Sequence, residues 1–265
     1  MSNFEEVGFL AEDMTSISDA LSTEYGAYLE ICDELNRFSQ KFQYDFEANT
    51  SDPAQLLSVI LFSRVLSTYQ ASLLVAHRGM KQQLKMLIRC ALEPLYPLVA
   101  ISKDRDFVCK LIESEEVERC KNIKKIIRYK ERNGQEDDDL KEARSLYKEL
   151  DAKIKKEKLK KISVFDCAQK AELSDWYDTL YALMSSTLHS SIRSLEEALH
   201  MDEEQNRILA LKNEPEIDSF DDLLIALAEC LMNSLLAVSK VLSMNEPEII
   251  EKCSAKIRSL KGAIV

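Results

Sequence analysis

The sequence predicts an all-α protein, a helical bundle of about eight helices with one protruding antiparallel helical hairpin. Only 5 Gly and 5 Pro occur among 265 residues, whereas sandwiches and barrels need many turn residues. Hydrophobic residues make up 46% and charged residues 31%, which is typical of a folded chain. We therefore expect residues 1–265 to form a single helical domain.

The first two helices are predicted from periodicity and from a start signal. Residues 12–47 repeat apolar side chains at three- and four-residue steps, as one face of a helix does. The next helix should begin at Asp52-Pro53, with Asp52 as the N-cap and Pro53 in the first turn. Gly79 should end it.

A third helix, over about 80–102, is apolar at almost every position from Met86 to Ile101. Such a segment should be buried all round. Pro94 and Pro97 interrupt it, and each removes a backbone donor. We therefore expect a kink or a break in this helix.

A charged hairpin should project from the bundle. Asp104 can cap a long polar helix that ends near Gly134, and a second charged helix follows over about 137–160. The second helix has only a narrow apolar stripe, which suits packing against one neighbour. The sequence thus predicts an antiparallel arm over residues 104–160.

The last part of the chain should hold four more helices and a loop. A short helix is expected over 163–171, and a long one over about 175–200. Residues 201–218, rich in acidic residues, Asn and Pro, indicate a loop. Two further helices are expected, from about 218 to 244 and from 246 onward.

Composition favours a cytoplasmic protein. The seven cysteines are scattered and form no CxxC pair, as expected of reduced, buried thiols. The acidic N-terminus lacks the apolar region of a signal peptide. The most apolar stretch, 56–75, contains Arg64 and Gln70, so we expect a buried helix and no membrane partner. With only three histidines, no metal site is expected.

The first candidate site is the pair Arg89 and Glu93. They stand four residues apart on one helix face, in a segment otherwise suited to the core. Two buried charges are costly unless they pair and gain further hydrogen bonds. The pair is therefore either a structural ion pair between helices or part of a functional site.

The second candidate is a polar stripe on the helix predicted over 175–200. His189, Arg193, Glu196 and His200 fall on one side of it. Arg and protonated His can both donate to phosphate, and His can act as general acid or base near neutral pH. The alternative is an ordinary solvated helix face.

The third candidate is a lysine run in the arm. The six lysines within nine residues are Lys153, Lys155, Lys156, Lys158, Lys160 and Lys161. The net charge is −11, yet residues 121–161 hold 15 Lys/Arg against 9 Asp/Glu, a local balance of +6. Lysines can neutralise nucleic-acid phosphates, but no aromatic residues are interleaved for base stacking. A solvated arm is the alternative.

Two short motifs carry a family resemblance. The segment Leu87–Glu93, followed by Trp176-Tyr177 and by Tyr181–Ser190, resembles a bacterial family of unknown function, DUF5677. That family has an LxRxxxE helix and a YxxLSxxxH helix. The resemblance covers roughly residues 55–200.

The same motifs are similar in layout to HEPN domains, small helical bundles of bacterial toxin and phage-defence systems. This resemblance implies a metal-independent ribonuclease without a cofactor, acting as a homodimer on RNA through an Arg and a His on one helix. Here the literal spacing falls on Arg193 and His200, with six residues between them. The alternatives are a site rebuilt from Arg89, Glu93 and His189, or a scaffold without nuclease activity.

The chain has no P-loop, GxGxxG, HExxH or GxSxG motif, so none of the enzyme classes that these motifs mark is indicated. Two functions remain. One is a HEPN-like ribonuclease, with His189 as acid or base and Arg89 or Arg193 on the scissile phosphate. The other is a non-enzymatic helical module whose arm binds a protein partner.

Overall fold

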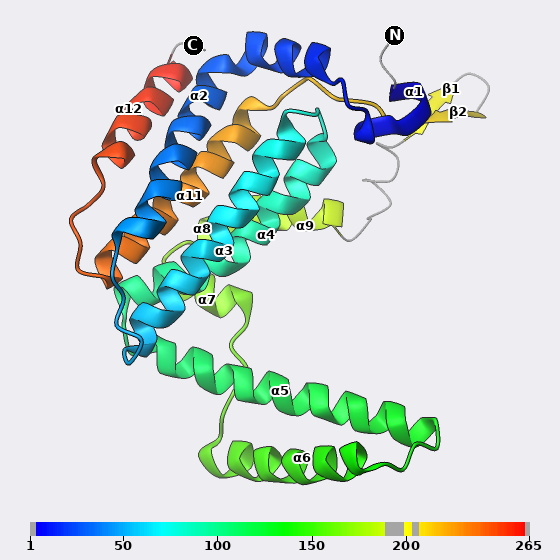
Figure 1. Ribbon diagram of the computed structural model, residues 1–265, viewed down its shortest axis with the longest axis vertical. Coiled ribbons are helices and arrows are strands. Elements are labelled where there is room, and N and C mark those ends of the chain that lie inside the picture. The colour runs from blue at the N-terminus through cyan, green and yellow to red at the C-terminus, as the bar shows by residue number, and fades with distance from the viewer. Residues whose placement is uncertain (1–3, 189–198, 203–206, 263–265) are drawn as a thin grey trace.

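The computed structural model describes residues 4–188, 199–202 and 207–262, and it confirms an all-α bundle with a protruding hairpin (Figure 1). The long helices are α2 (Thr15–Asp45), α3 (Pro53–Ala76), α4 (Lys81–Lys103), α5 (Phe107–Arg132), α6 (Asp138–Glu157), α11 (Asp221–Val241) and α12 (Glu248–Gly262). The short ones are α1 (Phe4–Val7), η1 (Gly8–Leu10), α7 (Val164–Lys170), α8 (Ser174–Trp176), η2 (Tyr177–Tyr181) and α9 (Ala182–Leu188). A small antiparallel pair, β1 (Leu199–Asp202) and β2 (Arg207–Leu211), is added to them.

Helix α11 is the central element of the bundle. It packs against α2, α3 and α4, and 15 of its 21 residues are buried. One polar group in this core, the Tyr69 hydroxyl, donates to the Cys32 carbonyl over 2.8 Å, whereas the buried Ser239 hydroxyl of α11 has no partner among the described residues. Burial of apolar surface around α11 therefore holds the four long helices together.

Helices α3 and α11 are the two described helices that are long and apolar enough to cross a membrane, by length and composition alone. The most apolar window of α11 is 78% buried and that of α3 is 39% buried. The core helix of a soluble protein passes the same test, so this is weak evidence for a membrane span.

The predicted start of α3 is confirmed. The Asp52 side chain accepts hydrogen bonds from the amides of Ala54 and Gln55, and Pro53 occupies the first turn. The Asp52 carboxylate also pairs with Arg105 at the start of the arm. One residue thus caps a core helix and connects it to the arm.

Two expectations for α4, a break at its prolines and burial on all sides, were wrong. The helix runs without interruption through Pro94 and Pro97. The carbonyls that the prolines leave without a helical partner belong to Cys90 and Glu93, and both of these residues are exposed, so water can reach that side of the helix. Because Cys90 and Glu93 are exposed, α4 is also not buried on all sides.

The arm has the predicted form. Helices α5 and α6 pack antiparallel and project from one end of the bundle, crosswise to its helices (Figure 1). They share a small apolar core of their own, made by Cys120, Ile123, Ile127, Leu140 and Leu150. At the exposed tip, Asp137 caps α6 by accepting from the Leu140 amide, and Lys130 lowers the Asp137 pKa. The hairpin is therefore packed largely on itself.

The helix predicted over 175–200 is confirmed in its described part up to Leu188 but is wrong for residues 199–200, and a loop over all of 201–218 was also wrong. Residues 174–188 divide into α8, the π-helical turn η2 and α9. Residues 199–202 pair as a strand with 207–211. The apolar residues here fit the period of a helix, but they also fit a pair of strands. In such a pair the backbone hydrogen bonds run from one strand to the other instead of along one helix.

The turn between α3 and α4 generates a stability prediction. Gly79 has φ +68°, and an added Cβ would lie 2.8 Å from the Glu216 carbonyl oxygen. Its own carbonyl accepts from the Glu216 amide over 2.9 Å. Gly79→Ala should therefore lower the free energy of unfolding by at least about 2 kcal/mol, through left-handed strain and a backbone clash.

Gly134 is the matched control for this substitution. It has φ +64° with open space around it, so Gly134→Ala should cost only about 1 kcal/mol from strain. Urea denaturation of both variants measures the difference. Equal destabilisation would contradict a close approach at Gly79.

Candidate functional site

The Arg89 guanidinium is the centre of a polar network between α4, η2 and α9. Its Nη1 lies 3.1 Å from Glu93 Oε1, Nη2 donates to the Tyr181 hydroxyl over 2.8 Å, and Nε donates to Ser185 Oγ over 3.0 Å. The Arg89 side chain is only 12% exposed, whereas that of Glu93 is 44% exposed. A nearly buried cation is thus compensated by one charge and two hydroxyls.

The partners of Arg89 also bind one another. The Tyr181 hydroxyl donates to Glu93 Oε1 over 3.2 Å, and the Ser185 hydroxyl donates to the Tyr181 carbonyl over 2.7 Å. The Tyr181 ring lies beneath the guanidinium, 4.7 Å from Cζ to the ring centre. Each hydroxyl therefore accepts from Arg89 and donates elsewhere, so their hydrogen-bonding capacity is well used.

The π-helical turn η2 places Tyr181 for this contact. The Ala182 amide donates to the Tyr177 carbonyl, five residues earlier, and the rings of Tyr177 and Tyr181 stack at 4.8 Å. Fully buried Tyr96 packs against both rings. Single π-helical turns are frequent at functional sites.

Burial governs the acidity of these tyrosines. It raises the pKa of Tyr181, although the Arg89 charge opposes the shift, and it raises the pKa of Tyr96 further. Tyr181 therefore keeps its proton at neutral pH and remains a donor to Glu93.

Beside this network lies a polar groove of about 500 Å³ between α3 and α4. It is lined by Leu61, Arg64, Ser67, Thr68, Cys90, Glu93 and Pro94. Arg64 is exposed and makes no ion pair among the described residues. Ser67 and Thr68 donate to carbonyls of their own helix, which leaves oxygen lone pairs facing outward. We name this the Glu93 groove.

Most of these residues lie in a region that matches a known family. The model of a family of unknown function, DUF5677, matches residues 55–207, more than half of the chain. The chain belongs to this family. Neither a curated protein nor a solved structure matches it. All four members of the Arg89 network and the Glu93 groove fall within the DUF5677 region.

The other predicted site residues are only partly described. His189 and Arg193 lie outside the described residues. His200 belongs to β1, where its backbone is opposite Ala210. Assigning His200 to one helical stripe with His189 and Arg193 was therefore wrong.

The lysine run spans the end of α6 and the loop toward α7, and all six lysines are exposed. Lys153 pairs with Glu116, Lys155 with Asp151 and Lys161 with Glu118. In the described part of the chain, Lys156, Lys158 and Lys160 make no such pair. About half of the positive charge is thus already matched within the arm, which weakens the run as a phosphate track.

Thiol exposure differs from the expectation of uniformly buried cysteines. Cys90 and Cys109 are exposed and the other five are buried, all without disulfides. Burial raises the pKa of Cys167 to about 11 and of Cys32 to about 12. Within the described residues, no group of three His, Cys, Asp or Glu side chains is placed to hold a metal ion.

The structure adds Tyr181, Ser185 and Arg64 to the residues selected from the sequence. Tyr181 and Ser185 are four apart, which indicates a shared helix face. Their polar groups could have been matched with buried Arg89, but only the packing of α9 on α4 identifies them as its partners. Arg64 stood out only as a charge in an apolar stretch.

The network predicts that Lys cannot replace Arg at position 89. The single ammonium group of a lysine cannot reach Glu93, Tyr181 and Ser185 at once, because it lacks the planar guanidinium whose three nitrogens make these contacts. Arg89→Lys should lower the free energy of unfolding by about 2 kcal/mol, as buried polar groups lose their partner. Chemical denaturation measures it.

Arg64→Lys is the matched control, because Arg64 is exposed on the neighbouring helix. It should change the free energy of unfolding by no more than about 0.5 kcal/mol. Comparable effects at both positions would rule out a specific role for the Arg89 fork.

Proposed function

We propose that this DUF5677 protein is a HEPN-like bacterial toxin or phage-defence protein that cleaves RNA without a metal or cofactor. The observation that carries the proposal is the Glu93 groove, where a fixed carboxylate lies with Arg64 and two hydroxyls. Cleavage of RNA by its own 2′-hydroxyl needs a base, an acid and a cation at the phosphate. The groove offers a base, Glu93, and a cation, Arg64.

Glu93 is suited to act as the base. One of its oxygens is held by Arg89 and Tyr181, and the side chain is 44% exposed to the groove. In the proposed reaction the 2′-oxygen forms a bond to phosphorus while its proton passes to Glu93. The phosphorus–O5′ bond breaks, and the products are a 2′,3′-cyclic phosphate and a 5′-hydroxyl end.

The acid and the phosphate ligand follow from the available side chains. The leaving O5′ takes its proton from His189, the role proposed for it from the family motif. Arg64 donates to the non-bridging oxygens, since it is exposed and without an ion pair among the described residues. Arg89 is a positioning residue, because its contacts with Glu93, Tyr181 and Ser185 occupy its guanidinium.

The test is cleavage of single-stranded RNA by the purified full chain in excess EDTA. Glu93→Gln and His189→Ala should each slow cleavage by roughly 10²–10⁴, the usual contribution of acid–base transfer. The product should be a cyclic phosphate, and the matched DNA should stay intact because it lacks the 2′-hydroxyl. Lys148→Ala, on the exposed face of the arm, should leave the rate unchanged.

Two further variants separate this site from the literal Arg–His spacing. If Arg193→Ala or His200→Ala abolishes cleavage while Glu93→Gln does not, the reaction belongs to that pair instead. Circular dichroism spectra matching wild type are required of each variant. Wild-type protein that neither cleaves RNA nor inhibits growth, alone or with its genomic neighbours, overturns the proposal.

The second candidate is a non-enzymatic module whose arm binds a protein partner, favoured by the surface of α5. Ile126 and Tyr129 stand three residues apart and are 51% and 60% exposed. They lie toward the far end of a hairpin that already has its own core. Exposed apolar side chains on a projecting helix can anchor a partner helix.

Ile126→Asp together with Tyr129→Ser should abolish capture of the partner by the tagged full chain, while Lys148→Glu should not. The apolar anchors carry the contact if the arm binds a partner, whereas a rim charge contributes little. Quantitative mass spectrometry of co-purified proteins compares the variants. Equal capture by all three proteins would remove the arm surface from consideration. A homodimer is proposed with either function, and light scattering measures it.

A further inference from the structure

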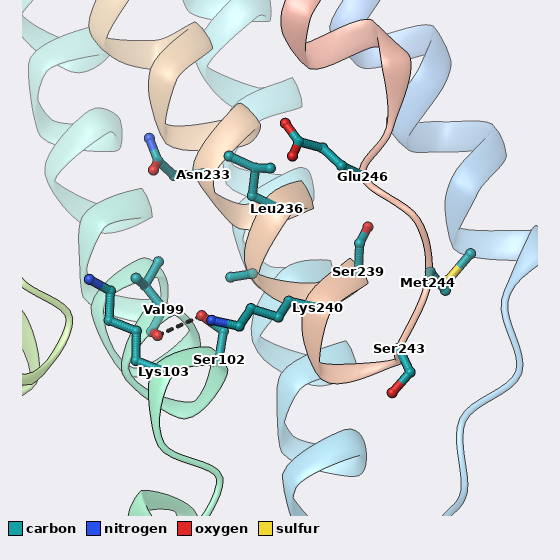
Figure 2. A pocket seen from close by; sticks show the side chains of 11 residues that line it. Val99, Ser102, Lys103, Asn233, Leu236, Ser239, Lys240, Ser243, Met244 and Glu246 are labelled. Atoms are coloured by element: carbon teal, nitrogen blue, oxygen red, sulfur yellow. Dashed lines mark hydrogen bonds between the residues drawn. The ribbon is translucent and has the colours of Figure 1, made fainter.

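A second groove, of about 510 Å³, lies between the last turn of α4, the second half of α11 and the loop before α12 (Figure 2). This size falls in the range of about 300–1,000 Å³ usual for small-molecule sites. Its α11 side is outside the family-matched region 55–207. It shares no lining residue with the Glu93 groove, so a ligand here is distinct from the proposed RNA substrate.

The Ser239 hydroxyl is a buried polar group without a partner in this groove. Ser239 is 1% exposed, and its Oγ has no hydrogen-bond partner among the described residues. Buried hydroxyls rarely remain unpaired, and helical serines such as Ser67 and Ser185 donate to a carbonyl four residues back. The adjoining loop lies against Ser239, since the Met244 amide donates to its carbonyl over 2.8 Å. A ligand oxygen at the foot of this loop would give the hydroxyl a partner.

Two charges flank this hydroxyl without ion pairs in the described part of the chain. Lys240 extends from α11 along one side of the groove, and Glu246 stands at the opposite edge (Figure 2). Lys103, at the α4 side, is already paired with Glu172. The groove thus offers one free cation, while Glu246 disfavours further negative charge on a ligand. This balance selects a single anionic group rather than a polyphosphate.

The rest of the lining is mixed. Ser102, Asn233 and Ser243 contribute small polar side chains, and Val99, Leu236, Ala237 and Met244 form an apolar part of the wall. Such a wall suits a hydrocarbon body, because burying it removes apolar surface from water. A polar end and an apolar wall therefore occur in one groove.

We propose that this groove binds a small organic acid with one negative charge and an apolar body. The Lys240 ammonium and the Ser239 hydroxyl hold the acid group, and the body lies on Val99, Leu236 and Ala237. The assignment rests on the unpaired hydroxyl, the unpaired lysine and the apolar wall together.

The test uses isothermal titration of the full chain with hexanoate, hexanol and hexylamine, which share one hydrocarbon body. Hexanoate should bind at least about tenfold more tightly than the other two, the value of a charged hydrogen bond. Lys240→Met should weaken hexanoate about tenfold and leave hexanol unchanged. Lys240→Gln serves if the Met variant does not fold.

Ser239→Ala separates binding from structure. It should weaken hexanoate about threefold, yet leave the melting temperature unchanged or higher, because an unpaired buried hydroxyl is removed. Lys148→Met, on the arm, should alter neither. The proposal is overturned if hexanoate does not bind at millimolar concentration, if hexanol or hexylamine binds equally well, or if hexanoate binds the Lys240 variants as it binds wild type.

Discussion

The guanidinium of Arg89 has to be compensated, because it stands in a stretch of α4 that is otherwise apolar apart from Glu93, and it is nearly buried. Leaving such a charge without its partners costs several kcal/mol, about 3–5 when one member of a buried pair is removed. Glu93 supplies the opposite charge from the same helix, but one carboxylate cannot satisfy the whole fork. The remaining donors reach Tyr181 and Ser185, so this requirement ties α4 to the segment 177–188.

This compensation explains the local backbone of the second motif. A π-helical turn ends at Tyr181, and the stacked tyrosines lie against fully buried Tyr96. A π turn has poorer hydrogen bonds than an α-helix, and the contacts of Tyr181 with Arg89 and Tyr96 offset that loss. The same contacts fix the carboxylate of Glu93 at the edge of its groove. Packing and the geometry of the proposed site thus have one origin.

Much of the fold could be predicted from the sequence because local signals and tertiary packing agree there. Asp52-Pro53 gives a helix start from side-chain chemistry alone, and the narrow stripe of 137–160 indicates a helix with one neighbour. The errors occurred where one pattern allows two structures. Apolar residues around 199–211 fit a helix or a strand pair, and the prolines of α4 lie within a continuous helix whose freed carbonyls belong to exposed residues.

The candidate site was only half predictable for a related reason. Arg89 and Glu93 stand out because charge is rare in that segment, whereas Tyr181 and Ser185 are ordinary residues of an amphipathic helix. Their role depends on how α9 packs on α4, which is tertiary information. Arg64 likewise joins Glu93 only because α3 and α4 lie side by side.

The Glu93 groove adjoins the root of the arm. Leu61 lines the Glu93 groove and also an apolar groove of about 470 Å³ at the root of the arm, beside Leu57, Pro97 and Ile112. A protein bound along the arm root would contact the wall that the two grooves share. Because Pro97 lies one helical turn beyond Glu93 on α4, such a partner would also approach the carboxylate proposed as the base. A partner that extends from Ile126 and Tyr129 to the root of the arm would therefore reach α4, which lines both the root groove and the Glu93 groove.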